Sequence, residues 1–423
     1  MASYTVNCFT NWVSDFASWV DLKTWLTSEA GGKLRVVEPR DSPYALIRYV
    51  KGQSNFDLEH VRWCRSVIVQ KDSRLPVCVA PPKSSVFEDN TAEVATVAEE
   101  FVDGTMMNVF QLDGSEPQLA TRSRLGGRTR FYEHGPTFGE MYTEVMNKMG
   151  VKALDGLLCD FEGSRARFTS TVLQHPANRI VKAVAEPALY VVHQGTVAAD
   201  GVVSIWEDAA EFQLDMDDAA DPEIQAYKLE PIQAAKTVRS WVEQQAQERG
   251  FGWQGLVLKD GKGRRWRMWS DIYQTVRRFR GNESSTEERF ARLRKSRSVD
   301  QYLSFFPEDR DALYELEGRL RKNTRQLLHF YGDVFRARKT AYHELPWPYK
   351  HHVSQLHNLY KDTLKAQGKK VDLEQVIRYV NGLTVEDTAN MSKVHKLELR
   401  PAKKAETEAV VAGTAEESKE TAQ

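Results

Sequence analysis

Two patterns of apolar residues divide the chain at about Asn282. Before it, short runs rich in β-branched and aromatic residues recur between turn signals, which is typical of β-strands. These runs are YALIRYV, RSVIVQ, LPVCVA, TMMNVFQL, LATRSR, ALYVVHQ, GLVLKD and RRWRMW. Apolar residues at helical spacing predict helices over residues 11–26, 137–150 and 231–250. Residues 1–282 are therefore expected to form an α+β domain.

After Asn282 the strand signals vanish and helical spacing takes over. One stripe begins with Leu313, Leu316 and Leu320, and it continues to Phe335. Pro346 and Pro348 interrupt this run, and helices are expected again over residues 351–368 and 372–383. We therefore expect an all-α C-terminal domain over residues 283–396. Residues 397–423 are expected to be a disordered tail, since they lack aromatic residues and have no large aliphatic residue after Val411.

Composition narrows the class of protein. The 423 residues are 41% apolar and 28% charged, and no apolar run reaches the 18 residues that a membrane-spanning helix needs. The N-terminus has neither the basic start nor the apolar core of a secretory signal. Cys8, Cys64, Cys78 and Cys159 are widely spaced, which favours reduced thiols. We expect an intracellular protein in a reducing, cytoplasm-like compartment, with no membrane partner.

Charge is balanced overall but unevenly placed. The formal net charge is −1, whereas residues 276–282 and 289–297 are rich in arginine and residues 207–223 are acidic. A basic surface of this kind can bind phosphate, although a solvated helix face explains the charges equally well. The candidate RNA contacts in these segments are Arg277, Arg278, Arg280, Arg292, Arg294 and Lys295.

Four histidines fall close together in the helical part, at positions 343, 351, 352 and 357. No cysteine or paired carboxylate accompanies them at the spacing of metal ligands, so we assign no metal site to them.

Six segments carry a further signal, because of their order along the chain. They are RWCRSVIVQ, LPVCVAPPKSSVF, EEFVDGTMMNVF, LATRSR, TVLQHPANRIVKAVAEPALYVV and WQGLVLKDGKGRRWRMWSDIY, followed by RRFRGN. In this order and spacing the chain resembles ATP-dependent RNA ligases of the bacteriophage RNA ligase 1 type, which are covalent nucleotidyltransferases. The most specific match is HPANRIV, because the family carries a Pro-x-Asn-Arg-Ile-Val run there. The resemblance covers roughly residues 4–282. It implies a nucleotidyltransferase domain of antiparallel, ATP-grasp-like sheets, followed by a C-terminal domain specific to the family.

The resemblance also implies that the chemistry of the family is lost. In that family a lysine of a Lys-x-Asp-Gly motif attacks the α-phosphorus of ATP, and the AMP then passes to an RNA 5′-phosphate. Phe101 stands at the position of this lysine, and a phenyl ring has no lone pair to offer phosphorus. Other positions also depart from the family: Val172 and Gln254 replace glutamates, Arg267 and Trp269 replace lysines, and Ser66 replaces a glycine.

Other positions match the family's pattern. By resemblance, the nucleotide- or phosphate-binding candidates are Arg65, Lys83, Asp103, Gly104, Arg122, Lys259 and, as a basic replacement for a lysine, Arg267. Asp103 and Gly104 are equally explained as turn-forming residues. Phe101, Val172 and Trp269 are all apolar and all expected to point at the nucleotide pocket, so we expect them to approach one another and partly fill it.

Three functions remain open. The first is a catalytically degenerate RNA ligase-like protein that binds RNA or serves as an assembly subunit, with no cofactor. The second is an active ATP- and magnesium-dependent RNA ligase for RNA repair or end joining, with Lys83 or Lys259 as a displaced nucleophile. The third is a protein scaffold on the same fold, such as a component of a viral particle or a large ribonucleoprotein.

Overall fold

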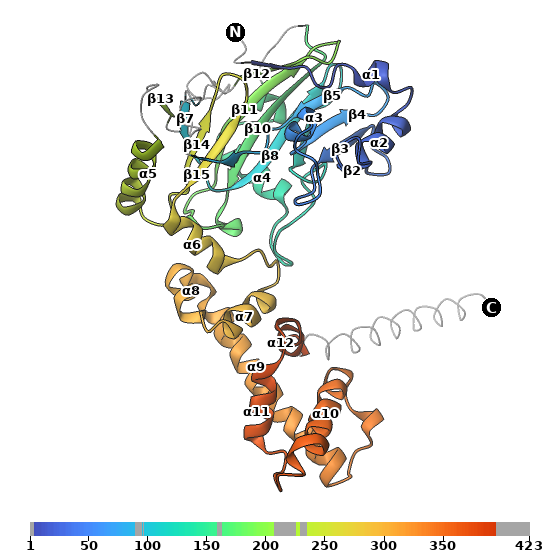
Figure 1. The fold of residues 1–423 in the computed structure, drawn as a ribbon, viewed down its shortest axis with the longest axis vertical. Coiled ribbons are helices and arrows are strands. Elements are labelled where there is room, and N and C mark those ends of the chain that lie inside the picture. Colours follow the sequence, from blue (N-terminus) through green and yellow to red (C-terminus); the bar gives the residue numbers. More distant parts are fainter. Residues whose placement is uncertain are drawn as a thin grey trace, which may run out of the picture. The chain divides into compact units, whose positions relative to one another are not determined.

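The computed structural model describes residues 4–88, 95, 97–158, 163–206, 226–228 and 235–394. The chain divides into two compact units, Met1–Arg278 and Phe279–Gln423. The first is mixed α+β and the second, over its described residues, is helical (Figure 1). The division falls four residues before the domain boundary expected from the sequence.

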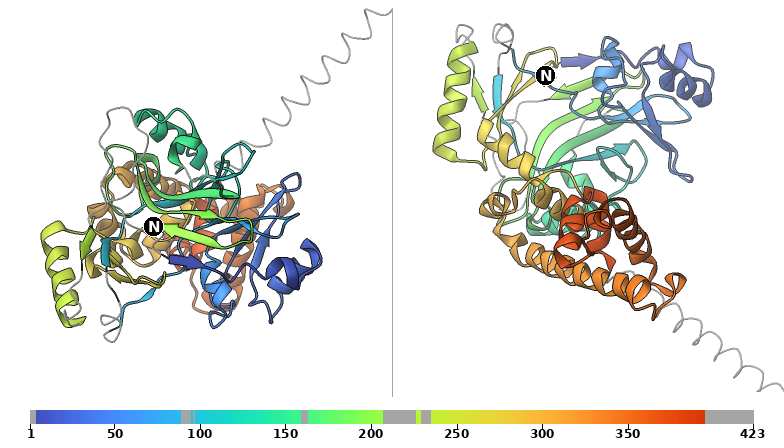
Figure 2. Two further views of the ribbon diagram at one scale, coloured as in Figure 1. Left: turned by 90° about the horizontal axis from the view of Figure 1, so that it is seen from above. Right: turned by 60° about the horizontal axis from the view of Figure 1, so that its bottom comes forward.

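A six-stranded antiparallel sheet is the largest element of the N-terminal unit (Figures 1 and 2). Its strand order is β1-β12-β11-β10-β8-β9. The strands are β1 (Tyr4–Val6), β8 (Thr105–Leu112), β9 (Gln118–Thr121), β10 (Ala166–Gln174), β11 (Ala188–Val197) and β12 (Val203–Trp206). Strand β8 matches the predicted run TMMNVFQL, and both of its faces are covered.

One face of this sheet packs against a second, four-stranded antiparallel sheet. That sheet has the order β2 (Arg35–Val37), β3 (Tyr44–Arg48), β4 (Val67–Gln70) and β5 (Pro76–Val79). Phe110 and Phe168 from the large sheet share a core with Ile68 and Val79 from the small one. Helices α1 (Trp12–Asp15), α2 (Trp19–Thr27) and α3 (Glu59–Trp63) also belong to this part of the unit.

The opposite face of the large sheet is covered by helix α4 (Phe138–Lys148). Met107 and Val109 of β8 pack there against Tyr142 and Val145. Thr137 begins the helix in a capping box, in which its side chain accepts from the backbone N–H of Glu140 and the Glu140 carboxylate accepts in return.

A third sheet has five strands in the order β13-β7-β14-β15-β6. They are β6 (Ser85–Val86), β7 (Val97–Glu100), β13 (Ala226–Lys228), β14 (Gly255–Lys259) and β15 (Arg265–Trp269), and only the β6–β15 pair is parallel. Helix α5 (Ala235–Arg249) covers this sheet, with Val238 and Val242 packed against Leu256 and Leu258.

The second unit is built from helices that follow α6 (Asp271–Arg280). They are α7 (Thr286–Lys295), α8 (Val299–Phe305), α9 (Arg310–Tyr331), α10 (Trp347–Leu359), α11 (Leu373–Gly382) and α12 (Val385–Ser392). The predicted stripe is confirmed, because Leu313, Leu316 and Leu320 on α9 are buried.

The coarse fold class is confirmed: an α+β region with antiparallel sheets precedes a helical region. The single helix predicted over residues 11–26 is wrong. The chain leaves the helical conformation at Phe16 and restarts after Ser18, whose hydroxyl caps α2 by accepting from the backbone N–H of Asp21 at 3.2 Å.

Three features named from the sequence lie outside the described residues, namely the tail at 397–423, Cys159 and the acidic segment 207–223. Cys8, Cys64 and Cys78 are free thiols. No helix among the described residues is long and apolar enough to cross a membrane.

Candidate phosphate-binding cleft

Residues 101–104 join two sheets. They follow β7 of the five-stranded sheet and precede β8 of the six-stranded sheet. The backbone N–H of Phe101 still donates to the Gly255 carbonyl at 2.9 Å, so the chain leaves the first sheet only after this residue. The position of the expected nucleophile therefore lies where the two sheets separate.

Asp103 holds this connection in place through hydrogen bonds. Its carboxylate accepts from the Tyr273 hydroxyl at 2.8 Å and from the backbone N–H groups of Val181 and Lys182, both at 2.9 Å. The Asp103 carbonyl accepts from the Gln174 side chain at 2.7 Å. Burial and the neighbouring Asp103 carboxylate raise the pKa of Tyr273, which keeps that hydroxyl a donor. With these bonds Asp103 ties β8 to the segment after β10 and to α6.

Two glycines are required by close approaches in the same region. A Cβ at Gly104 would lie 2.5 Å from a Val172 methyl and 2.6 Å from the Leu173 carbonyl oxygen. Gly255 has a φ of 125°, and a Cβ there would lie 2.1 Å from the Met268 carbonyl oxygen. Both glycines are thus explained by backbone packing.

Two of the three apolar replacements line a small cavity, and the third, Trp269, lies beside Phe101. Phe101 and Val172 line it with Val257, and its volume is about 110 Å³. The Phe101 and Trp269 rings are neighbours, with centroids 6.4 Å apart. Pockets that bind drug-sized ligands have volumes of about 300–1,000 Å³. The cavity is therefore too small to enclose a nucleotide.

The two glutamates that line this cavity are both in ion pairs. Glu99 forms an ion pair with Lys259 at 2.6 Å, with both side chains almost fully buried, and Glu100 forms one with Arg249. Magnesium prefers several oxygen ligands. Glu99 and Glu100 are in ion pairs, and the Asp103 carboxylate already accepts three hydrogen bonds. The residues present therefore do not fit a magnesium site. Among the described residues there is also no group of three or more histidine, cysteine, aspartate or glutamate residues placed to hold a metal.

The same region carries a group of cations for which the described part of the chain supplies no carboxylate partner. We call Arg48, Arg65, Lys83 and Arg122 the basic cluster. None of these four has an ion-pair partner within the described part of the chain. Arg65 also lines the small cavity.

Burial and repulsion from neighbouring cations lower the pKa values of three members of the basic cluster. Burial lowers the pKa of Arg65 to about 10, and Arg122, Arg265 and Arg267 contribute to the lowering by repulsion. Burial also lowers the pKa of Arg48, with repulsion from Arg35, Arg122 and Arg124. The pKa of Lys83 is lowered by burial and by Arg267 and Lys51. This mutual repulsion marks a local concentration of positive charge.

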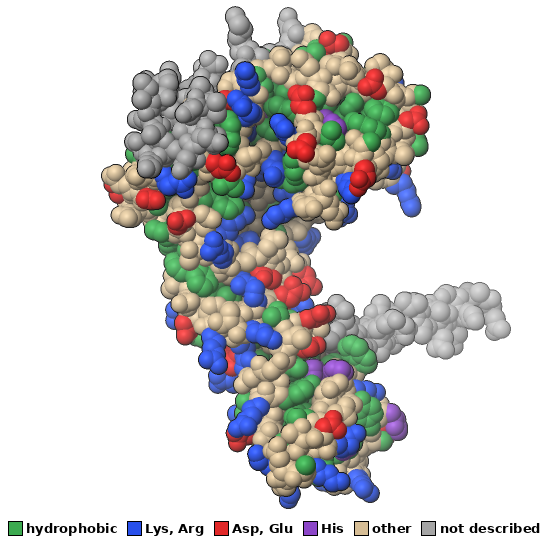
Figure 3. Space-filling view, viewed as in Figure 1, with side chains coloured by type: hydrophobic (Ala, Val, Ile, Leu, Met, Phe, Trp, Pro, Cys, Tyr) green, Lys and Arg blue, Asp and Glu red, His purple; other side chains and the backbone are tan. Residues whose placement is uncertain are grey.

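Aromatic rings lie beside the cations. The Lys83 ammonium is 4.2 Å from the centre of the Phe56 ring, and the Arg122 guanidinium is 5.4 Å from that of Tyr49. Arg267 lies 5.1 Å from the Trp269 ring and donates to the carbonyl oxygen of Ser84. Figure 3 shows Lys and Arg side chains gathered along a hollow in the N-terminal unit.

The structure thus brings together Arg65, Lys83, Arg122 and Arg267 of the predicted set. Lys259 is held by Glu99, and Asp103 and Gly104 have structural explanations. Sequence reasoning missed Arg48, Tyr49 and Phe56. Arg48 has one signal, since it ends an otherwise apolar strand.

The two arginine-rich segments differ from the basic cluster, because several of their cations have partners within the protein. Arg292 pairs with Glu283 at 2.6 Å, and Arg294 pairs with Glu317 at 3.0 Å. Lys295 donates to the Leu383 carbonyl at 2.9 Å, and Arg277 to the Tyr273 hydroxyl at 2.9 Å. Arg280 is buried and Arg278 is exposed. Several of these groups already have internal partners, so the basic cluster is the better candidate for phosphate.

Two comparisons with known proteins give no further guide to the class of protein. No protein-family model matches the chain, and no curated protein is significantly similar to it.

Proposed function

We propose that the chain binds single-stranded RNA through the basic cluster and does not form a lysyl-adenylate. It would be a catalytically degenerate relative of ATP-dependent RNA ligases, with a nucleotidyltransferase fold over the N-terminal unit. In the cell it would serve as an RNA-binding or assembly subunit. The observation that carries the proposal is a set of four cations, beside Tyr49 and Phe56, that have no carboxylate partner among the residues that the structure describes.

The chemistry of single-stranded RNA suits this arrangement. Phosphates are attracted to unmatched arginine and lysine side chains, and bases stack on aromatic rings. Mutual repulsion among the cations costs free energy in the unliganded protein. A polyanion that relieves this repulsion is therefore favoured over a neutral ligand.

The loss of adenylylation is supported by the residues around Phe101. One candidate amine, Lys259, is buried in an ion pair with Glu99 at 2.6 Å, so this amine is already engaged by a carboxylate. Lys83 lies over Phe56, so its ammonium is placed against a ring.

The RNA-binding test uses fluorescence anisotropy with a labelled single-stranded RNA of about 20 nucleotides, longer than the ~4–16 that one binding fold covers. We expect Lys83→Ala and Arg122→Ala each to weaken binding about 5- to 30-fold, equivalent to about 1–2 kcal/mol. Arg40→Ala is the matched control, since Arg40 is exposed and outside the cluster. If Lys83→Ala and Arg122→Ala bind the RNA as tightly as the control Arg40→Ala, the assignment of the site is refuted. If the parent chain does not bind the RNA at all, the protein scaffold is favoured.

A second assay addresses the chemistry. The chain is incubated with labelled ATP and magnesium and then separated by denaturing electrophoresis. We expect no covalently labelled band. A band that disappears in Lys259→Ala or Lys83→Ala would establish the active ligase instead.

A further inference from the structure

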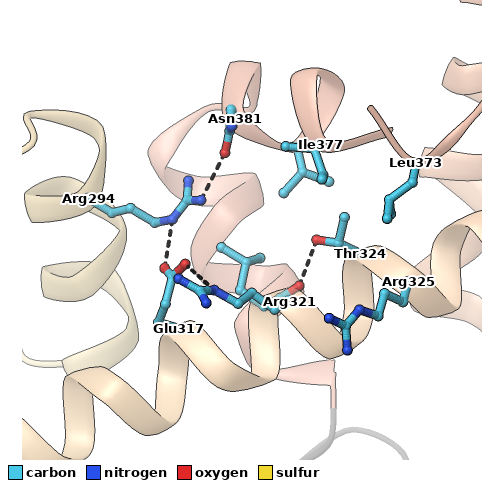
Figure 4. A pocket seen from close by; sticks show the side chains of 10 residues that line it. Arg294, Glu317, Arg321, Thr324, Arg325, Leu373, Ile377 and Asn381 are labelled. Atoms are coloured by element: carbon cyan, nitrogen blue, oxygen red, sulfur yellow. Dashed lines mark hydrogen bonds and ion pairs between the residues drawn. The ribbon is translucent and has the colours of Figure 1, made fainter. Parts of the chain in front are cut away.

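The helical unit contains a groove between α7, α9 and α11, with a volume of about 370 Å³. Its floor is aliphatic. Leu320 and Val380 are buried there, whereas Leu373 and Ile377 remain 41% and 43% exposed. Figure 4 shows Leu373 and Ile377 pointing from α11 towards α9. Two large side chains thus leave apolar surface open to solvent in one place.

The edge of the groove is positively charged. Arg294 and Arg321 each donate to the Glu317 carboxylate at 3.0 Å, and Arg294 also donates to Asn381 at 2.8 Å (Figure 4). Arg325 also lines the groove, and it forms no ion pair with any residue that the structure describes. Burial opposes ionisation of Glu317, but the bonds from Arg321 and Arg294 hold its pKa below the usual value. Three guanidinium groups therefore face one carboxylate.

This combination favours a peptide over RNA. None of the described residues that line the groove is aromatic, so it offers no ring on which a base can stack. An aliphatic floor with a basic edge instead suits a segment with small apolar residues flanked by carboxylates.

The chain itself contains a segment of this kind, which lies outside the described residues. Residues 405–418 read AETEAVVAGTAEES, in which an apolar centre, AVVA, separates Glu406 and Glu408 from Glu416 and Glu417.

The point where the chain leaves the last helix brings this segment within reach. The Met391 carbonyl near the end of α12 accepts a hydrogen bond at 2.7 Å from the side chain of Asn323, the residue before Thr324, which lines the groove. Fifteen residues separate Val394 from Val410. They can span about 50 Å when extended, against a helix diameter of about 10 Å.

We propose that this groove binds the acidic C-terminal segment of the same chain, residues 405–417. Val410 and Val411 cover Leu373 and Ile377, and the flanking glutamates meet Arg321 and Arg325. This intramolecular contact is independent of RNA binding by the N-terminal unit.

The test compares the full chain with a chain that ends at Arg400, using a fluorescein-labelled peptide of residues 404–418 at low salt. The shortened chain should bind the peptide saturably, and more weakly as salt rises. The full chain should bind it at least about tenfold more weakly, because its own segment competes at millimolar effective concentration. In the shortened chain, Ile377→Glu and Arg325→Glu should each weaken binding about tenfold or more.

Lys322→Glu is the matched control, because Lys322 is an exposed cation on the same helix but does not line the groove. It should bind the peptide less than twofold more weakly than the shortened parent chain. Circular dichroism verifies that all variants keep their helices. Three results would overturn the proposal: no binding to the shortened chain, equal binding to both chains, or displacement of the peptide by single-stranded RNA. A full chain that dimerises through the segment would also overturn the intramolecular form.

Discussion

At the scale of single residues, the N-terminal unit depends on Asp103. Its buried carboxylate accepts three hydrogen bonds from groups far apart in the sequence: Tyr273, Val181 and Lys182. Removing it leaves three donors without this acceptor, and two of them, on Tyr273 and Val181, belong to fully buried residues. A residue that the ligase resemblance assigns to nucleotide binding is therefore also a structural residue.

We expect Asp103→Ala to destabilise the N-terminal unit by about 3 kcal/mol, since hydrogen bonds to a buried charge contribute ~1.5–3 kcal/mol each and are not additive. Urea unfolding followed by tryptophan fluorescence measures the change. Asp113→Ala, at an exposed turn position, is the control and should stay within about 0.5 kcal/mol of the parent. A similar small change in Asp103→Ala would contradict the structural role.

Two residues at the small cavity, Phe101 and Val172, differ from the ligase pattern in different ways: one lacks an amine and the other lacks a carboxylate. Phe101 and Val172 line the same small cavity, so a lysine introduced at position 101 would face an aliphatic side chain where the ligases that the sequence resembles have a glutamate. One introduced amine would therefore not by itself create a site for metal and triphosphate.

At the scale of elements, the contact between α10 and α11 contains a buried histidine. Nδ1 of His352 lies 2.8 Å from the Tyr379 hydroxyl, and the residue is 6% exposed. Burial lowers the pKa of His352 below its usual 6.5, and His351 adds to this effect while Asp387 opposes it.

The lowered pKa of His352 in the folded state determines the direction in which stability changes with pH. Below pH 6.5 the unfolded chain takes up the proton more readily than the folded chain, so the unfolding free energy falls as pH falls. We expect the thermal midpoint of the helical unit to decrease between pH 7.5 and 5.5, and to decrease less in His352→Gln. His343→Gln, at an exposed position, should keep the parent's dependence. Identical pH profiles for the parent and His352→Gln would contradict this origin.

At the scale of the whole molecule, the net charge is −1, but positive charge is locally in excess at the basic cluster. Carboxylates balance Arg292 and Arg294, whereas Arg48 and Arg122 have no carboxylate partner within the described residues. Attraction to RNA is decided by such local excess, because charges more than about 8–10 Å away are screened at physiological salt.

This local excess predicts the salt dependence of RNA binding. If about four phosphates contact the basic cluster, the logarithm of affinity should fall with the logarithm of salt concentration at a slope near −3. Arg122→Ala should reduce the slope by about one unit, and Arg40→Ala should not change it. Anisotropy titrations at several salt concentrations measure both slopes, and a flat profile would exclude phosphate contacts as the source of affinity.

The sequence by itself determined the division of the chain and much of its secondary structure. Apolar periodicity is a local property, so TMMNVFQL and the stripe on α9 could be assigned from neighbouring residues alone. It also determined that Phe101 supplies no nucleophile, because side-chain chemistry does not depend on the fold. Strand β10 was missed, since its polar residues Thr169 and Ser170 are buried only through partners on other strands.

Only the tertiary structure decided which charges remain unmatched. Lys259 and Arg122 are both cations by sequence, yet Lys259 on β14 is paired with Glu99 on β7, whereas Arg122 has no carboxylate partner among the described residues. The basic cluster, the commitment of Asp103 and the groove between α7, α9 and α11 all depend on residues distant in the chain. Ion pairing and burial act through distances in space, and the fold alone sets those distances.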